Sequence, residues 1–173
     1  MSPSSGWDAD QAVTSLYAAH YRTLVRLAAL LLRDAGEAEE VVQDAFVAMH
    51  GGWRRLRDPD KALAYLRQSV LNRARSVLRR RAVREKHTPA PASYAPSAEH
   101  QALATEQQHT IVAALRTLPE RQREAVVLRY YADLSEADTA LAMGISRGAV
   151  KSHTARGMAA LRRHLENVEK QPW

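Results

Sequence analysis

The chain has 173 residues, a formal net charge of +6 and no cysteine. This length leaves room for one ordinary domain or two small ones. The lack of cysteine excludes disulfides and thiolate metal sites, which suits a reducing compartment. The longest apolar run, residues 27–32, is too short to span a membrane, and the polar N-terminus does not resemble a secretory signal. We therefore expect a cytoplasmic protein with no membrane insertion.

Composition and periodicity favour helices along the whole chain. Only seven Gly and seven Pro occur, and the apolar-periodic stretches are rich in Ala, Leu, Arg and Glu. Residues 86–102 contain three prolines and no apolar periodicity, which is typical of a linker. The sequence predicts an all-α protein with two small helical domains, residues 10–85 and 103–169, joined by a flexible linker over 86–102.

The first domain is predicted to contain three helices with apolar residues at helical spacing. The first helix is followed by a turn at residues 34–36, a second helix over 37–50, a loop at 57–60 and a third helix over 61–84. The residues expected to face the interior are Leu16, Leu24, Leu27 and Leu31 in the first helix, Ala38, Val42, Ala45, Phe46 and Met49 in the second, and Leu63, Leu66, Val70, Ala74 and Val77 in the third.

Charge is distributed unevenly in this domain. Residues 34–44 hold five acids and no base, whereas residues 54–84 hold eleven bases against two acids. In the second helix, Glu37, Glu40 and Asp44 fall opposite the apolar face, with Val47 among them. The outer face of the third helix collects Tyr65, Gln68, Asn72, Arg75, Ser76 and Arg79. One acidic and one basic surface indicate two different partners.

The second domain is predicted to begin with helices over 103–117 and 120–131, with Pro119 in the first turn of the latter. The stretch 134–157 then has the spacing of a helix-turn-helix. Ser135 and Ser146 are expected to cap its two helices, and Gly144 can adopt the positive φ of the turn between them. Ala140, Ile145 and Val150 are expected to face the core.

With Val150 facing inward, the second helix of this motif presents cations, a hydroxyl and small residues outward. That mixture suits the major groove of DNA, and a cation near the helix start could reach a phosphate. An ordinary helical hairpin with a solvated basic face would have the same spacing. The residues expected to face DNA are Arg147, Gly148, Lys151, Ser152, Ala155 and Arg156.

From residue 16 to residue 165 the chain resembles the extracytoplasmic-function (ECF) group of sigma-70-type RNA polymerase sigma factors, of an actinobacterial, SigE-like type. Three motifs carry the resemblance, in the order that the family has them. Residues 38–50, AEEVVQDAFVAMH, are similar to its polymerase-docking helix. Residues 62–81, ALAYLRQSVLNRARSVLRRR, are similar to the helix that engages the −10 element. The third motif, LPERQREAVVLRYYADLSEADTALAMGISRGAVKSHTARGMAALRRHL over 118–165, resembles the domain that reads the −35 element.

The resemblance implies a sigma factor that binds core RNA polymerase and directs promoter recognition, −10 melting and transcription initiation. The acidic helix would dock on the clamp of the polymerase, and the helix over 120–131 would offer a surface to its flap. The second domain would read duplex DNA at −35. An anti-sigma factor is a further expected partner. The residues implied for polymerase docking are Glu37, Glu40, Gln43, Asp44 and Val47.

At the −10 element the resemblance implies contact with single-stranded DNA. Asn72 stands at the family position that helps hold a flipped base, and its amide can both donate and accept hydrogen bonds. The arginines of the same helix, up to Arg81, would hold the DNA backbone electrostatically. The full set expected there is Tyr65, Gln68, Asn72, Arg73, Arg75, Ser76, Arg79 and Arg80.

An enzyme and a stand-alone helix-turn-helix regulator are the two alternatives to a sigma factor. For an enzyme, the sequence offers no paired metal ligands, phosphate loop or nucleophile elbow, so no catalytic residue, metal or cofactor is expected. A stand-alone helix-turn-helix regulator would account for residues 134–157. It would leave the acidic helix and the −10-like helix without a role.

Overall fold

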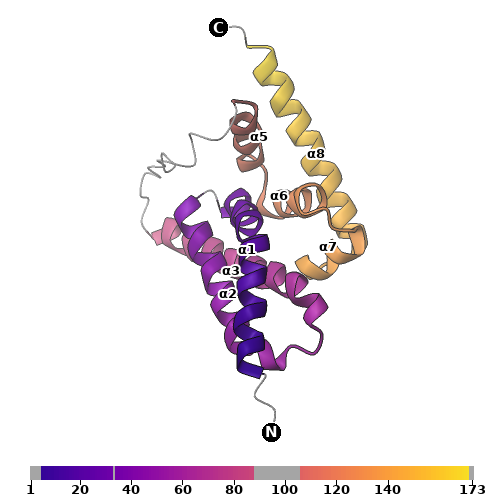
Figure 1. Cartoon of the computed structure of the whole chain (residues 1–173). Helices are drawn as coiled ribbons and strands as arrows, with labels where there is room; N and C mark the ends of the chain where they lie inside the picture. The colour runs from indigo at the N-terminus through magenta and orange to yellow at the C-terminus, as the bar shows by residue number, and fades with distance from the viewer. Residues whose placement is uncertain (1–4, 33, 88–105, 172–173) are drawn as a thin grey trace. The chain divides into compact units, whose positions relative to one another are not determined.

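A computed structural model describes residues 5–32, 34–87 and 106–171, and all regular structure in these ranges is helical. The chain divides into two compact units, Met1–Ala95 and Pro96–Trp173 (Figure 1). The predicted linker lies outside the described residues except for Lys86 and His87, which belong to the last helix of the first unit. The prediction of an all-α protein with two helical parts is confirmed.

The first unit is built on helices α1 (Ser5–Leu32), α2 (Ala35–Gly52) and α3 (Ala62–His87), each of which packs against the other two. Two single 3-10 turns, η1 (Trp53–Arg55) and η2 (Pro59–Lys61), connect α2 to α3. Of the residues expected inside, Leu16, Leu63 and Val77 are only half-buried. The others form the core as predicted: Leu24, Leu27, Leu31, Ala38, Val42, Ala45, Phe46, Met49, Leu66, Val70 and Ala74.

The turn predicted at residues 34–36 is wrong, because α2 already begins at Ala35. The Asp34 side chain accepts a hydrogen bond from the backbone N–H of Glu37 (Oδ1···N 3.1 Å), and its carbonyl oxygen accepts one from Ala38 at 3.0 Å. Asp34 is therefore the N-cap of the helix, and Gly36 lies in its first turn. An Asp-Ala-Gly sequence suits a turn or a helix start, and these two hydrogen bonds favour the helix.

The second unit consists of α5 (Glu106–Arg116), α6 (Glu120–Val126), α7 (Glu136–Met143) and α8 (Arg147–Glu169), with a π-helical turn η3 (Val127–Tyr131) after α6. Helix α8 packs against α5, α6 and α7. Pro119 is the N-cap of α6 and not part of its first turn. The predicted helix over 120–131 is formed by α6 and η3 together. Its last turn is π-helical, because the N–H of Ala132 reaches back five residues to the carbonyl of Val127 at 3.1 Å.

Helices α6 and α8 lie in close contact at Gly157, which is buried in the middle of α8. A Cβ atom built on Gly157 would lie 2.7 Å from Cγ2 of Val126 and 3.3 Å from the carbonyl oxygen of Gln122. The missing side chain is what lets the two helices approach this closely. Gly157 therefore fixes how α8 sits on the rest of its unit.

Candidate polymerase and promoter interfaces

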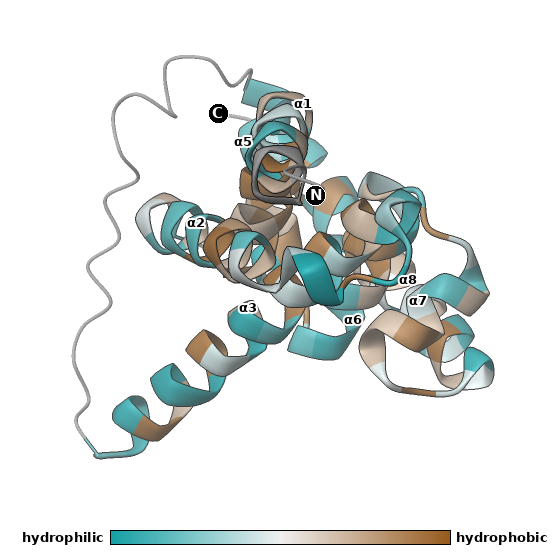
Figure 2. Cartoon of the chain, turned by 60° about the horizontal axis from the view of Figure 1, so that its bottom comes forward, coloured by the Kyte–Doolittle hydropathy of each residue, from teal (hydrophilic) through white to brown (hydrophobic). Residues whose placement is uncertain are grey.

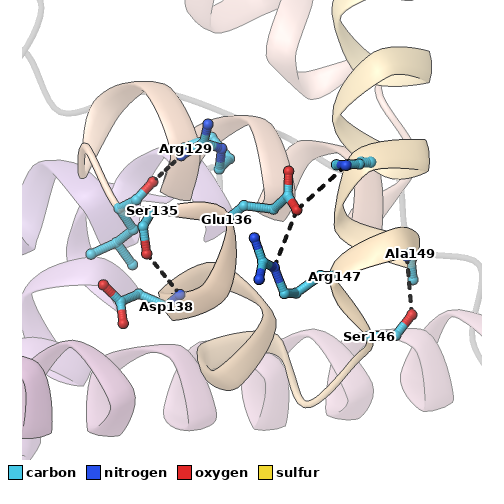
Figure 3. A network of polar contacts seen from close by, with 9 residues as sticks. Arg129, Ser135, Glu136, Asp138, Ser146, Arg147 and Ala149 are labelled. Carbon is cyan, nitrogen blue, oxygen red and sulfur yellow. Dashed lines mark hydrogen bonds and ion pairs between the residues drawn. The ribbon is translucent and has the colours of Figure 1, made fainter.

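The helix-turn-helix is assembled by local hydrogen bonds that the sequence pattern predicts. Ser135 accepts a hydrogen bond from the N–H of Asp138 at 3.0 Å, and Ser146 accepts one from Ala149 at 3.1 Å (Figure 3). Between them Gly144 has φ 66° and ψ 35°, the left-handed conformation that ends α7. The expected caps and turn are confirmed, so the start of α8 is held at a defined angle to α7.

The outward face of α8 has the exposure predicted for a surface that could meet DNA. Ala140 and Val150 are buried beneath it, as expected. Ile145 is half-buried where the core was predicted, because it directly follows the exposed turn residue Gly144. The six residues expected to face DNA are all exposed: Arg147, Gly148, Lys151, Ser152, Ala155 and Arg156. Ala149, which lies beside them and was not in this set, is half-buried.

A carboxylate on α7 holds two cations of this face. The Glu136 side chain lies 3.4 Å from Nε of Arg147 and 4.0 Å from Nζ of Lys151 (Figure 3). These ion pairs join the first turn of α7 to the first turns of α8. These contacts were not predicted, because a pair eleven residues apart leaves no local pattern in the sequence.

Helix α6 supports the turn of the helix-turn-helix through Arg121. The Arg121 guanidinium donates hydrogen bonds to Oε2 of Glu124 at 3.2 Å and to the carbonyl oxygen of Met143 at 3.4 Å. Glu124 is only 2% exposed, so this charged pair has a fixed position. Asp133, with φ 53°, and a hydrogen bond from Arg129 to the carbonyl of Leu134 shape the loop before α7.

In the first unit, an open groove of about 580 Å³ runs between α2 and α3. Its α2 wall carries Glu37, Glu40 and Asp44, which the sequence assigned to polymerase docking. Its α3 wall carries most of the set assigned to the −10 element, namely Tyr65, Gln68, Asn72, Arg73, Ser76 and Arg80. The acidic and basic surfaces predicted from the sequence are therefore the two sides of one groove.

Four of the expected residues do not line this groove: Gln43, Val47, Arg75 and Arg79. The Gln43 amide donates to the hydroxyl of Tyr21 at 3.4 Å, and Val47 is 72% exposed. Gln43 therefore contacts α1, whose Tyr17 stacks on Tyr21 with ring centroids 4.4 Å apart. Partial desolvation, the Tyr21 hydroxyl and the Glu39 carboxylate raise the pKa of the Tyr17 phenol above its ordinary value.

The polar face of α3 is ordered by hydrogen bonds within the helix. Asn72 accepts from Nε2 of Gln68 at 3.1 Å through its side chain, and from the hydroxyl of Ser76 at 3.1 Å through its carbonyl. Arg79 donates to the Ser76 hydroxyl and Arg80 to the Ser76 carbonyl, each at 3.3 Å. Figure 2 shows that the far end of α3 is largely hydrophilic.

Arg81 is engaged inside the first unit. Its guanidinium donates to the carbonyl oxygen of Leu32 at the end of α1 (2.8 Å) and forms an ion pair with Glu37 on α2. Arg81 was expected to hold the DNA backbone. In the structure its guanidinium also makes these contacts, which join three helices. The same ion pair makes Glu37 less available to a partner than the exposed Glu40 and Asp44.

Comparison with known proteins agrees with the two-unit arrangement of motifs. Residues 16–84 match the model of Sigma-70 region 2, and residues 108–161 match that of Sigma-70, region 4. The RNA polymerase sigma-E factor of Streptomyces avermitilis is 35% identical over 146 residues, which are 83% of this chain and 79% of that protein. The ECF RNA polymerase sigma factor SigM of Mycobacterium tuberculosis is 34% identical over 154 residues, 89% of this chain and 77% of the relative.

The fold also matches a solved structure, the sigma factor RpoE of Bartonella quintana in complex with the anti-sigma factor NepR. The TM-score is 0.72 at 22% identity, covering 88% of this chain and 96% of that one. Fold and motifs thus define a two-part sigma-70 architecture with a helix-turn-helix in the second part. The chain belongs to the ECF RNA polymerase sigma factors of the sigma-70 family.

As a sigma factor, the protein directs RNA polymerase to promoters for the initiation of transcription. Sigma factors are regulatory subunits. A stand-alone helix-turn-helix regulator is not favoured, because that class leaves the region 2 match over residues 16–84 without a role. In the described parts of the chain, no helix combines the length and apolarity that a bilayer crossing requires. The same residues contain no cluster of His, Asp and Glu suited to a metal ion.

Proposed function

We propose that the two sides of the α2–α3 groove serve two different partners during initiation. The α2 side, with Glu40, Asp44 and the neighbouring Gln43 and Val47, docks on the polymerase clamp. The α3 side, centred on Asn72, binds the single-stranded −10 element. The observation that carries this proposal is the groove itself, because it combines an acidic wall with a basic, amide-bearing wall. A basic partner helix suits the first wall, and exposed bases with their phosphates suit the second.

The exposed face of α8 reads duplex DNA at −35 under the same proposal. Arg147 and Lys151 contact phosphates, whereas Ser152 and Arg156 reach base edges in the major groove. The small residues Gly148 and Ala155 allow α8 to approach the groove floor. Helix α6 supports α8 and offers a surface to the polymerase flap. Two weak DNA contacts on one chain bind a promoter more tightly than either contact alone.

We further propose that the protein acts in the cytoplasm as a non-catalytic subunit. Its domains, residues 10–85 and 103–169, are connected by the linker 86–102. An anti-sigma factor holds it inactive by covering these surfaces. The relative from Bartonella quintana was solved with such a partner, which supports the same kind of control here. Recovery of polymerase subunits alone in a pull-down from native cells would count against this partner.

The test is initiation by purified protein and core polymerase on a genomic promoter library. Initiation at specific promoters is expected, and its absence at every promoter would refute the proposal. The double variant Glu40→Gln/Asp44→Asn should weaken core binding about tenfold, because it removes two exposed charges facing a basic partner. Glu39→Gln is a suitable control, since it removes an acid of the same helix outside the groove. Equal loss in Glu39→Gln would contradict the assignment of the α2 wall.

A further inference from the structure

Glu136 is a largely covered anion that pairs with two exposed cations of the proposed −35 face. Its side chain is 22% exposed, whereas those of Arg147 and Lys151 are 69% and 71% exposed. Its position in the first turn of α7 also suits a negative charge, because the helix dipole is positive there. The two cations can therefore exchange this carboxylate for another anion, while the carboxylate stays in place.

The anion that these cations would meet on DNA is a phosphate, which also offers negatively charged oxygen atoms. We propose that Glu136 takes the place of a DNA phosphate in the free protein and thereby lowers the sequence-independent affinity of the second unit for DNA. This inference rests on the proposed function, in which Arg147 and Lys151 face the promoter. Glu136 acts through these two residues and is a positioning residue that itself does not touch DNA.

The effect falls on phosphate binding more than on base reading. Ser152 and Arg156, assigned to base edges, lie further along α8, and the Glu136 contacts are made at Arg147 and Lys151. Random DNA offers mainly phosphate contacts, so the loss falls on most of its binding free energy. A promoter also supplies base contacts, which the carboxylate leaves intact. Glu136 thereby lowers the occupancy of random DNA, while base contacts still hold the protein at a promoter.

The test compares Glu136→Gln with Asp138→Asn in the full chain. Each change removes one acid from the first turn of α7, and Figure 3 shows the Asp138 carboxylate pointing away from Arg147. The probe is a random-sequence DNA duplex, with binding followed by fluorescence anisotropy between about 50 and 200 mM salt. Glu136→Gln should bind about threefold more tightly than Asp138→Asn, with a steeper dependence on salt because freed cations contact phosphates.

The direction of the change separates this inference from a merely structural role. If Glu136 only stabilised the motif, its removal would weaken binding, and that result would overturn the inference, as would equal affinities for the two variants. Glu136→Asp keeps the charge on a shorter side chain and should fall between wild type and Glu136→Gln.

The double variant Arg147→Gln/Lys151→Gln tests the proposed function separately. Unchanged DNA binding in this variant would refute the −35 face itself. Weaker binding in it, combined with no gain in Glu136→Gln, would refute only the role of Glu136. Circular dichroism on each variant verifies that the helices are retained, so that affinities are compared between folded proteins.

Discussion

Gly148 and Gly157 lie in the same helix, but a methyl group would meet different surroundings at the two positions. At Gly148 an added Cβ would be 3.9 Å from Oγ of Ser146, which is ordinary contact. At Gly157 it would be 2.7 Å from Val126, and the backbone of Gln122 behind it cannot rotate away as a side chain can. Alanine favours a helix over glycine by about 1 kcal/mol at either position.

We expect Gly157→Ala to lower the free energy of unfolding by about 1–2 kcal/mol, because overpacking costs more than the helix propensity returns. Gly148→Ala should be neutral or stabilising by up to about 1 kcal/mol. Urea denaturation followed by far-UV circular dichroism measures both. If Gly157→Ala were as stable as Gly148→Ala, α6 and α8 would not be in close contact at this point.

At the scale of single residues, local chemistry was predictable and distant contacts were not. The caps Ser135 and Ser146 and the turn residue Gly144 follow from sequence, since each acts within four residues of its own position. The ion pair of Arg81 with Glu37 joins residues 44 positions apart, and the contact of Gly157 with Val126 joins two helices. Such contacts depend on tertiary packing, for which one sequence offers no local pattern.

Among the elements, α3 packs against the other two helices of the first unit and is also joined to both by Arg81. Replacing Arg81 by Met keeps the aliphatic stem but removes the ion pair to Glu37 and the hydrogen bond to Leu32. Arg84→Met is the matched control, since Arg84 is exposed and lines the same groove.

We expect Arg81→Met to destabilise the first unit by about 1 kcal/mol, because it leaves a half-buried carboxylate without this partner. Arg84→Met should leave stability within about 0.5 kcal/mol of wild type. Hydrogen exchange of the first unit's amides distinguishes the two variants, because only Arg81→Met should speed exchange near the end of α1 and the start of α2. The same exchange in both variants would show that Arg81 does not connect the helices.

The order and faces of the helices were predictable because apolar periodicity specifies them directly. The residues at which the helices begin and end were harder to predict. Helix α2 begins earlier than expected because Asp34 caps it, and the helix over 120–131 ends in the π-helical turn η3. A π-helical turn changes the register by one residue without breaking the apolar pattern, so periodicity does not reveal it. Tyr130, which is 65% exposed, lies in this turn.

For the whole molecule, the two proposed DNA contacts should fail independently. Arg156→Gln removes a proposed base contact at −35 and should weaken holoenzyme binding to promoter DNA about tenfold. Asn72→Ala should leave duplex binding by the second unit intact and reduce opening at −10. Permanganate reactivity of unpaired thymines measures opening, and footprinting measures duplex binding. If either variant lost both activities equally, the two units would not read the promoter separately.

The groove between α2 and α3 also bears on how many molecules of the protein are available in a cell. Its lining sets three carboxylates against four guanidinium groups, so the formal charge of the lining is only +1. A chromosome offers about 10⁶–10⁹ non-specific sites, and a protein with an uncompensated cationic groove would be distributed among them. We expect the acidic wall to reduce this loss to bulk DNA. The free pool then remains within reach of polymerase by diffusion, although the chain as a whole is positively charged.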